Sequence, residues 1–133
     1  AYDVGACDWS SDVCSSDLGR GGLRRPRPTV PTVYVTAPPD AADELARTLV
    51  ADRLAACVNR VDCDSVYRWE GEVHEEHEVI LLAKTTDDRY DALRDRIETE
   101  HPHDVPCIER FDEADVLPAY ASWVEDETTP GRD

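Results

Sequence analysis

The strongest indication of the fold is the sequence SVYRWEGEVHEEHEVILLAKTT, which spans Ser65–Thr86. Residues 66–69 combine β-branched and aromatic side chains, a composition typical of a strand. Gly71 follows within a turn, because glycine adopts a positive φ without strain. The chain then returns to the apolar run Val79–Ala83, which is too short for an ordinary helix but has the length of a buried strand. We therefore predict a long two-stranded hairpin, whose face and edge must be covered by the rest of the chain and by a second copy of it.

The residues on either side of the hairpin complete the pattern. Leu45 and Leu49 recur at helical spacing, as do Leu93 and Ile97 further along, and Asp40 is the expected N-cap of the first helix. The pattern predicts, in chain order, a strand over Thr29–Thr36, a helix from about Asp40 to Val58, a short connection at Arg60–Asp64, the hairpin, a helix from about Thr86 to His101, a strand over Val105–Phe111 and a short helix from Pro118. This order predicts an α+β protein of the ferredoxin-like split β-α-β-β-α-β type, with a four-stranded antiparallel sheet and both long helices on one face. Oligomerisation is the expected cover for the other face.

The formal net charge of −16 over 133 residues is the dominant feature of the composition. Such a surface repels nucleic acid and anionic lipid, so neither is an expected partner. Lys84 is the only lysine among 14 basic residues, and this balance is typical of salt-loving (halophilic) microbes. We interpret the charge as adaptation to salt rather than as a binding site. We therefore expect higher stability at molar salt, where charges are screened within about 3 Å.

The remaining composition excludes several classes of protein. A hydrophobic content of 41% indicates a globular domain, and no apolar run approaches the length of a membrane span. The sequence has no charged start followed by an apolar stretch of the signal-peptide type, so nothing in it argues for export. The sequence also has no glycine-rich phosphate loop, nucleophile elbow or His-Glu-x-x-His motif, so nothing in it supports a hydrolase or a transferase.

Residues 1–28 differ from the rest, because their four Asp and four Arg leave no net charge. Within them, residues 8–18 resemble a translated sequencing adapter, and the stretch that follows is typical of a linker. The spacing of Cys7 and Cys14 fits no common metal motif. We predict three parts: an artefactual or disordered extension at 1–28, a folded domain at 29–127 and a polar tail at 128–133.

Four motifs in register make the pattern specific. They are Arg53–Asn59 (RLAACVN), Ser65–Gly71 (SVYRWEG), Glu78 with Lys84–Thr86, and the pair His101-Pro102 and Val105-Pro106. In this order and spacing, residues 30–126 resemble the CutA family of divalent-cation tolerance proteins. The resemblance implies a ferredoxin-like fold and a tight homotrimer, in which the hairpins join neighbouring sheets around a threefold axis. It also implies a cytoplasmic protein linked to tolerance of copper and other divalent cations, with no established enzymatic reaction.

The metal ligands proposed for that family are a cysteine in the first strand, a histidine beside the His-Pro motif and a glutamate after the second proline. The matching positions here hold Val35, Glu100 and Cys107, and His103 replaces the aromatic residue that usually follows His-Pro. Of these residues, Glu100 and Cys107 can still coordinate metal.

A candidate metal site lies at the corner between the second long helix and the last strand. His101, His103 and Cys107 fall within seven residues, and imidazole and thiolate together suit Cu or Zn. With Glu100 beside them, they form the predicted site for Cu(II) or another divalent metal. The alternative is a surface loop with a half-buried cysteine.

The hairpin carries a second group of candidate ligands, His74 and His77 among Glu75, Glu76 and Glu78. On a regular strand the two histidines face opposite sides, so a shared metal would need a bulge. We favour the alternative, a solvated acidic stretch that discourages edge-to-edge pairing.

Three further residues are expected at a subunit interface or cleft. Tyr67 and Trp69 point to the same side of the first hairpin strand, and Lys84 ends the second. The ammonium of Lys84 either pairs with a carboxylate such as Glu78 or Glu70, or contacts a small anionic ligand.

Two functions follow from these predictions. We favour a trimeric, non-enzymatic CutA-like protein that binds divalent metal weakly. The alternative is a trimeric small-molecule sensor of the PII-like kind, which shares the fold and acts on a partner protein through a long mobile loop. The only insertion between strands, Glu70–Glu78, is short, and the first function is therefore preferred.

Overall fold

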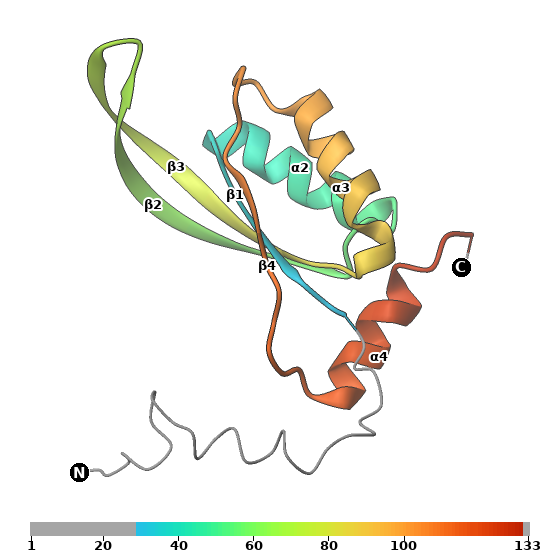
Figure 1. The fold of residues 1–133 in the computed structure, drawn as a ribbon. Helices are drawn as coiled ribbons and strands as arrows, with labels where there is room; N and C mark the ends of the chain where they lie inside the picture. The colour runs from blue at the N-terminus through green and yellow to red at the C-terminus, as the bar shows by residue number, and fades with distance from the viewer. Residues whose placement is uncertain (1–28, 132–133) are drawn as a thin grey trace, which may run out of the picture.

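The computed structural model describes residues 29–131 (Figure 1). Its elements, in chain order, are β1 (Thr32–Ala37), α2 (Pro39–Ala51), β2 (Cys57–Trp69), β3 (Glu72–Lys84), α3 (Asp87–Glu100), β4 (Ile108–Phe111) and α4 (Pro118–Glu127). This order confirms the predicted α+β class and the β-α-β-β-α-β pattern with a short C-terminal helix. The predicted adapter and linker within 1–28, and the pair Cys7 and Cys14, lie outside the described residues, as do residues 132–133.

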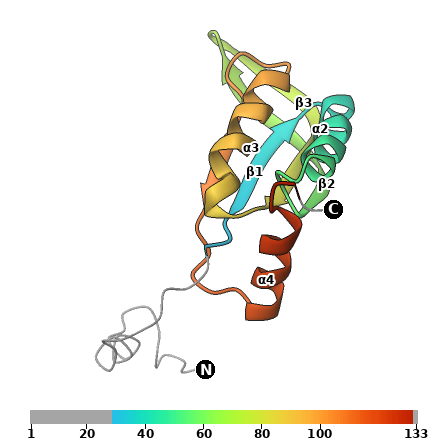
Figure 2. The ribbon, with the colours of Figure 1, turned by 90° about the vertical axis from the view of Figure 1, so that its right-hand side faces the viewer.

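The four strands form one antiparallel sheet in the order β2-β3-β1-β4. Figures 1 and 2 show that α2 and α3 lie on one face of this sheet, while α4 lies beyond its end. The β2–β3 hairpin is the longest part, with 13 residues in each strand against six in β1 and four in β4. Its tip therefore extends past the other two strands.

The main core lies between the sheet and helices α2 and α3. Because side chains alternate between the two faces of a strand, every second residue in β1 and in the second half of β3 is buried against the helices. The largest of the fully buried side chains in this core are Val33, Val35, Leu45, Leu49, Leu81, Leu93 and Ile97. Each large apolar side chain buried in this way stabilises the fold by about 1.5–3 kcal/mol.

Helix α2 is shorter than the sequence predicted. The predicted helix reached Val58, but α2 ends at Ala51, and Arg53 takes a left-handed conformation with a φ of 59°. The amide of Leu54 donates a 2.9 Å hydrogen bond to the carbonyl of Leu49, a pairing typical of a helix end. Leu54 is buried although it lies beyond the helix, so the apolar pattern in the sequence extends past the end of α2. The predicted end of the helix, which followed this pattern, was therefore wrong.

The start of α2 also differs from the prediction. Pro38 occupies the N-cap position and Pro39 is the first helical residue, so Asp40 lies in the first turn and is not the cap. Proline costs little at this position, because the amide hydrogen that it lacks has no partner in a helix. Asp40 remains favourable near the positive end of the helix dipole.

Strand β2 is longer than predicted. The segment Arg60–Asp64, predicted as a connection, is part of the strand, and Cys57 and Val58 begin it. Most of its residues are exposed, so the local composition carried little strand signal. Pairing with the apolar half of β3 holds the segment in the sheet, where Asn59 lies opposite Leu82.

The hairpin turn confirms the role predicted for glycine. The chain reverses over Glu70 and Gly71, which have φ values of 50° and 84°. Two successive positive φ angles are typical of the I′ turn that matches the twist of a two-residue hairpin. The sequence did not predict the positive φ of Glu70, a conformation that is strained for residues other than glycine.

Strand β4 begins at Ile108, three residues later than predicted. Pro106 has no amide hydrogen for the ladder, and Val105 is 69% exposed in the loop before it. The segment between α3 and β4 is therefore a longer loop than predicted, and it carries His103 and Cys107.

Helix α4 packs separately from the main core. Val30, Ala121 and Val124 form a small buried cluster that attaches it to the residues before β1. Thr128 is also buried, and its Oγ1 donates a 2.8 Å hydrogen bond to the carbonyl of Val124.

Across residues 29–131, no helix has the length and apolar content needed to cross a membrane.

Candidate functional site

The candidate site lies on the face of the sheet opposite to the helices. The pairing register places Tyr67 opposite His74 and Trp69 opposite Glu72, so Tyr67 and Trp69 share one face as predicted. A cavity of about 580 Å³ opens there, lined by Tyr67, Trp69 and Glu78 and by the loop that follows α3. This volume lies within the range typical of small-ligand sites.

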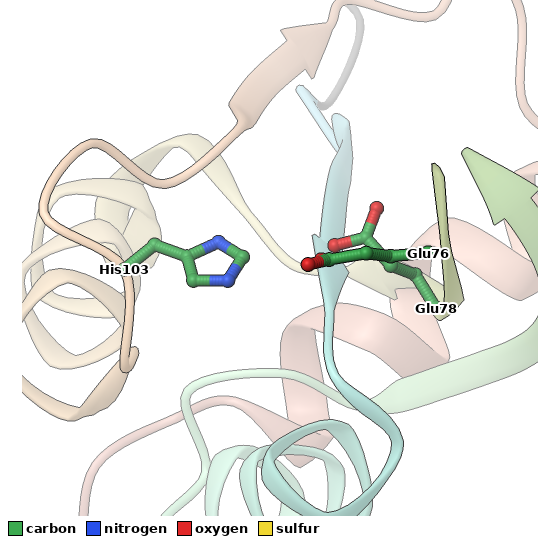
Figure 3. Close-up of side chains that lie close together, drawn as sticks. All are labelled: Glu76, Glu78 and His103. Atoms are coloured by element: carbon green, nitrogen blue, oxygen red, sulfur yellow. The ribbon is translucent and has the colours of Figure 1, made fainter. Parts of the chain in front are cut away.

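Three potential metal ligands meet beside this cavity (Figure 3). Glu76 and Glu78 are two residues apart on β3, which places both carboxylates on one face of the sheet. His103, from the loop after α3, directs its imidazole toward them. One ligand atom from each of the three residues lies within 4.8 Å of the other two. Two carboxylates and an imidazole form a set that binds divalent cations.

The carboxylate of Glu78 is the most unusual member of this group. Glu78 is only 5% exposed and lines the cavity. Within the described part of the chain, its carboxylate has neither a hydrogen bond nor an ion pair. A buried polar group without a partner costs free energy, and a buried charge costs more. Such a carboxylate favours the entry of a cation.

Glu76 is exposed and is oriented by Tyr67. The Tyr67 hydroxyl donates a 2.8 Å hydrogen bond to Oε1 of Glu76. The Tyr67 ring stacks on the imidazole of His74, with centroids 5.4 Å apart. The hydrogen bond to Glu76 is the main cause that raises the pKa of Tyr67, and burial of the hydroxyl adds to it. Tyr67 is therefore a hydrogen-bond donor at neutral pH.

His101 is occupied by bonds within the protein. It is buried, its Nε2 lies 2.8 Å from the carbonyl oxygen of Thr36, and its Nδ1 accepts a 3.0 Å hydrogen bond from the backbone amide of His103. These two bonds assign a neutral ring protonated at Nε2. Burial is the largest cause that lowers the pKa of His101, although the bond to Thr36 opposes it. Both nitrogens are engaged, so neither offers a lone pair to a metal.

The structure brings together only part of the metal site predicted from the sequence. His103 and Cys107 line the same cavity. Glu100 is the last residue of α3, where it is exposed and lies 3.7 Å from Arg96. With Glu100 on the helix and both nitrogens of His101 engaged, the four predicted ligands do not meet around one point. The residues that do meet His103 come instead from β3.

Cys107 contributes a thiol to the wall of the cavity. Partial burial raises the pKa of this thiol, and the negative charges of Glu109 and Glu78 raise it further, while hydrogen bonding with Thr36 opposes them. The thiol therefore stays protonated at neutral pH. Metals bind the thiolate, so a metal at Cys107 would have to displace this proton.

The two hairpin histidines lie on opposite faces of β3, as expected for a regular strand without a bulge. His74 stacks on Tyr67, whereas the Nδ1 of His77 lies 3.1 Å from a carboxylate oxygen of Asp64. The shared metal site that would have required a bulge is therefore not formed by these two residues.

Lys84 takes a partner that the sequence did not suggest. Its Nζ donates a 2.8 Å hydrogen bond to Oγ1 of Thr32, which in turn donates a 2.6 Å bond to Glu113. The predicted ion pair with Glu78 or Glu70 is not formed. Glu78 lies six residues away along the same strand, about 20 Å at the usual rise, and Glu70 lies farther still.

From the sequence, Glu76 and Glu78 were assigned to a solvated acidic stretch, and Glu78 was also a possible ion-pair partner of Lys84; neither was predicted to join His103 in a metal site. The sequence did contain a signal for a shared role in metal binding. Side chains alternate between the two faces of a strand, which places Glu76 and Glu78 on the same face as Tyr67. The approach of His103, 25 residues beyond Glu78, depends on how α3 crosses the sheet and was not visible in the sequence.

Comparison with known proteins identifies relatives over the whole folded part. A sequence model described as CutA1 divalent ion tolerance protein matches residues 31–127. The chain is 40% identical over 97 residues to a protein of Pyrococcus horikoshii described as divalent-cation tolerance protein CutA. That alignment covers 72% of this chain and 95% of the relative.

Solved structures with a similar fold carry related descriptions. A protein from a Nostoc species, described as a PII-like protein CutA in apo form, superposes with a TM-score of 0.73 and 31% identity, covering 75% of this chain and 98% of that one. A protein from Archaeoglobus fulgidus, described as a periplasmic divalent cation tolerance protein CutA, gives a TM-score of 0.72 and 28% identity, covering 75% of this chain and 99% of that one.

Proposed function

Because the chain belongs to the CutA1 family of divalent ion tolerance proteins, we propose that it is a non-enzymatic protein of divalent-cation tolerance and response. In this proposal it binds divalent metal ions weakly, copper among them. The names of its relatives support the general role, and the residues of the cavity support direct binding of metal.

The observation that carries this proposal is the buried carboxylate of Glu78, which faces the imidazole of His103 without a partner of its own. A cation in the cavity offsets the cost of burying this charge. The formal charge of −16 also raises the local concentration of cations around the protein.

We also propose that the protein works as a homotrimer in the cytoplasm. The open face of the sheet carries exposed apolar side chains, notably Val61, Trp69 and Phe111, which are 42–45% exposed. Exposed apolar surface of this kind favours association with other copies of the chain. Cys57, Cys63 and Cys107 are all free, which suits a reducing compartment. Light scattering at molar KCl tests the assembly, and a mass equal to one chain contradicts it.

Calorimetric titration of the metal-stripped, full-length protein with Cu(II) in molar KCl tests the metal-binding function. We expect saturable binding, because a defined set of ligands fills at a fixed ratio. Mg(II) at the same concentrations is the control for general attraction to the acidic surface. Heats that do not saturate, or that match those of Mg(II), contradict the proposal.

A second candidate function is a small-molecule sensor of the PII-like kind. Two observations favour it: the cavity of about 580 Å³ beside Tyr67 and Trp69, and the likeness to the PII-like protein from Nostoc. The two-residue turn at Glu70 and Gly71 argues against it, since it leaves no long loop between β2 and β3 for a partner. Thermal shifts with nucleotides and other small anions distinguish the two functions, because a metal-tolerance protein shows shifts with metals alone.

A further inference from the structure

We propose that Glu76, Glu78 and His103 form a three-ligand site for a divalent first-row transition-metal ion of the zinc and cobalt kind. The inference rests on the proposed function and specifies the ligands of that function. All three ligands come from one chain, so the site is complete without a neighbouring subunit. It shares only His103 with the set predicted from the sequence.

The spacing of the three side chains is close to that of a metal site. Their ligand atoms lie within 4.8 Å of one another. Zinc binds nitrogen and oxygen at about 2.0–2.2 Å, which places tetrahedral ligands about 3.4 Å apart. The side chains therefore need to close by at most about 1.4 Å when the ion binds. Glu76 is exposed, and His103 lies in a loop, so both can make this movement.

Glu78 is the second, independent observation that points to a cation. Its side chain lies in the wall of the cavity, 5% exposed, with no hydrogen bond or ion pair inside the described region. Buried carboxylates in proteins are normally paired, hydrogen-bonded or bound to a metal. Binding a divalent cation supplies the partner that this carboxylate lacks.

The imidazole of His103 is free to act as a ligand. Neither ring nitrogen has a hydrogen-bond partner among residues 29–131, while the backbone amide of His103 is held by Nδ1 of His101 at 3.0 Å. The two rings are tilted against each other, with centroids 4.9 Å apart. His101 therefore fixes the start of the loop and leaves the His103 ring facing the carboxylates (Figure 3).

Glu76 is oriented by Tyr67 in a way that suits metal binding. The hydroxyl of Tyr67 donates to Oε1, which leaves Oε2 of Glu76 available to the ion. Hydrogen bonds of this kind fix a ligating carboxylate and commonly change metal affinity by about 10- to 100-fold. Tyr67 is thus a positioning residue for the site.

The ligand set selects the class of metal. One imidazole with two carboxylates suits borderline ions such as zinc and cobalt, whereas magnesium and calcium prefer sites built from oxygen alone. The thiol of Cys107 lines the same cavity but lies outside the three-residue cluster. The proposed site therefore contains no sulfur ligand, and water completes the coordination.

The test is calorimetric titration of the metal-stripped, full-length protein with Zn(II) in molar KCl. We compare Glu78→Gln and His103→Gln with two matched controls on β3, Glu75→Gln and His77→Gln. Glu75 and His77 are exposed on the opposite face of the strand, so the controls make the same chemical changes away from the site. We expect one zinc per chain, about 100-fold weaker binding in each site variant and a change of about two-fold or less in the controls. Tyr67→Phe is expected to weaken binding by about ten-fold.

Co(II) provides a readout of the ligands themselves. We expect visible absorption bands without thiolate-to-cobalt charge transfer, unchanged by Cys107→Ser. Saturable binding that is insensitive to Glu78→Gln and His103→Gln overturns the site but leaves the proposed function standing. A thiolate band that Cys107→Ser abolishes also overturns it. If neither Zn(II) nor Co(II) binds saturably, the site is overturned, and the Cu(II) titration alone decides whether metal binding is part of the function.

Discussion

Nδ1 of His101 accepts a hydrogen bond from the backbone amide of His103, with 3.0 Å between the two nitrogens. Through Nε2, the same ring is bound to the carbonyl of Thr36 in β1. One buried imidazole therefore connects the central strand to the loop that carries a candidate ligand. The position of His103 over β3 depends on this connection.

Replacing His101 with glutamine should lower the free energy of unfolding by about 1–3 kcal/mol. Glutamine does not span both partners with the same geometry, so the Thr36 carbonyl or the His103 amide loses its bond in a buried place. Urea denaturation of the metal-free protein in molar KCl measures the change. His77→Gln, at an exposed site, is the control and should stay within about 0.5 kcal/mol. Equal effects of the two substitutions would show that the buried bonds do not matter.

Replacing Glu78 with glutamine should stabilise the metal-free protein by about 1 kcal/mol. The substitution keeps the size of the side chain and removes a buried charge that has no partner within residues 29–131. Chemical denaturation in the presence of a chelator measures it, with Glu75→Gln as the control for loss of one surface charge. A clear loss of stability in Glu78→Gln alone would mean that the carboxylate already has a favourable partner in the metal-free state.

Without metal, Glu78→Gln should be more stable than the unsubstituted protein, and zinc should reverse this order. At a free concentration of about 100 times the dissociation constant, a ligand that binds only the folded state stabilises it by about 2.7 kcal/mol. We expect this gain in the unsubstituted protein, little of it in Glu78→Gln, and its loss on adding a chelator. The measurement is the denaturation midpoint with and without zinc. A gain of the same size in both proteins argues against Glu78 as a ligand.

Replacing Leu81 with alanine should cost about 2–5 kcal/mol. Leu81 is fully buried in the second half of β3, where the deletion leaves a cavity between the sheet and the helices. The matched control is Leu117→Ala at the start of α4, where the side chain is 69% exposed and the cost should stay within about 0.5 kcal/mol. Thermal or urea denaturation compares the two. Similar costs at both positions would contradict the placement of the core.

Added KCl should raise the melting temperature at neutral pH. The 30 acidic residues repel one another in dilute buffer, and molar salt screens this repulsion beyond about 3 Å. Repeating the melts near pH 4.4, the isoelectric point, provides the control, because the net charge and hence this salt effect should be small there. A melting temperature that stays constant or falls with KCl at neutral pH argues against adaptation to salt.

Several features of the fold could be predicted because they depend on neighbouring residues. The alternation in β3, the turn at Gly71 and the helical spacing of Leu93 and Ile97 each arise within a few residues, so the order of elements was correct. The boundaries that were wrong depend on distant contacts. The exposed residues of Arg60–Asp64 form a strand because β3 pairs with them, and Leu54 is buried without being helical.

For the candidate site, the sequence by itself determined which residues share a face. Glu76 and Glu78 lie on the side of Tyr67, because side chains alternate along a strand. Only the tertiary structure decided which of the four predicted ligands remain available. The packing of α3 on the sheet buries His101 against β1, leaves Glu100 in solvent and brings His103 across to the two glutamates. The physical reason is that the position of the loop follows from the core beneath it, and that core is formed by residues far apart in the chain.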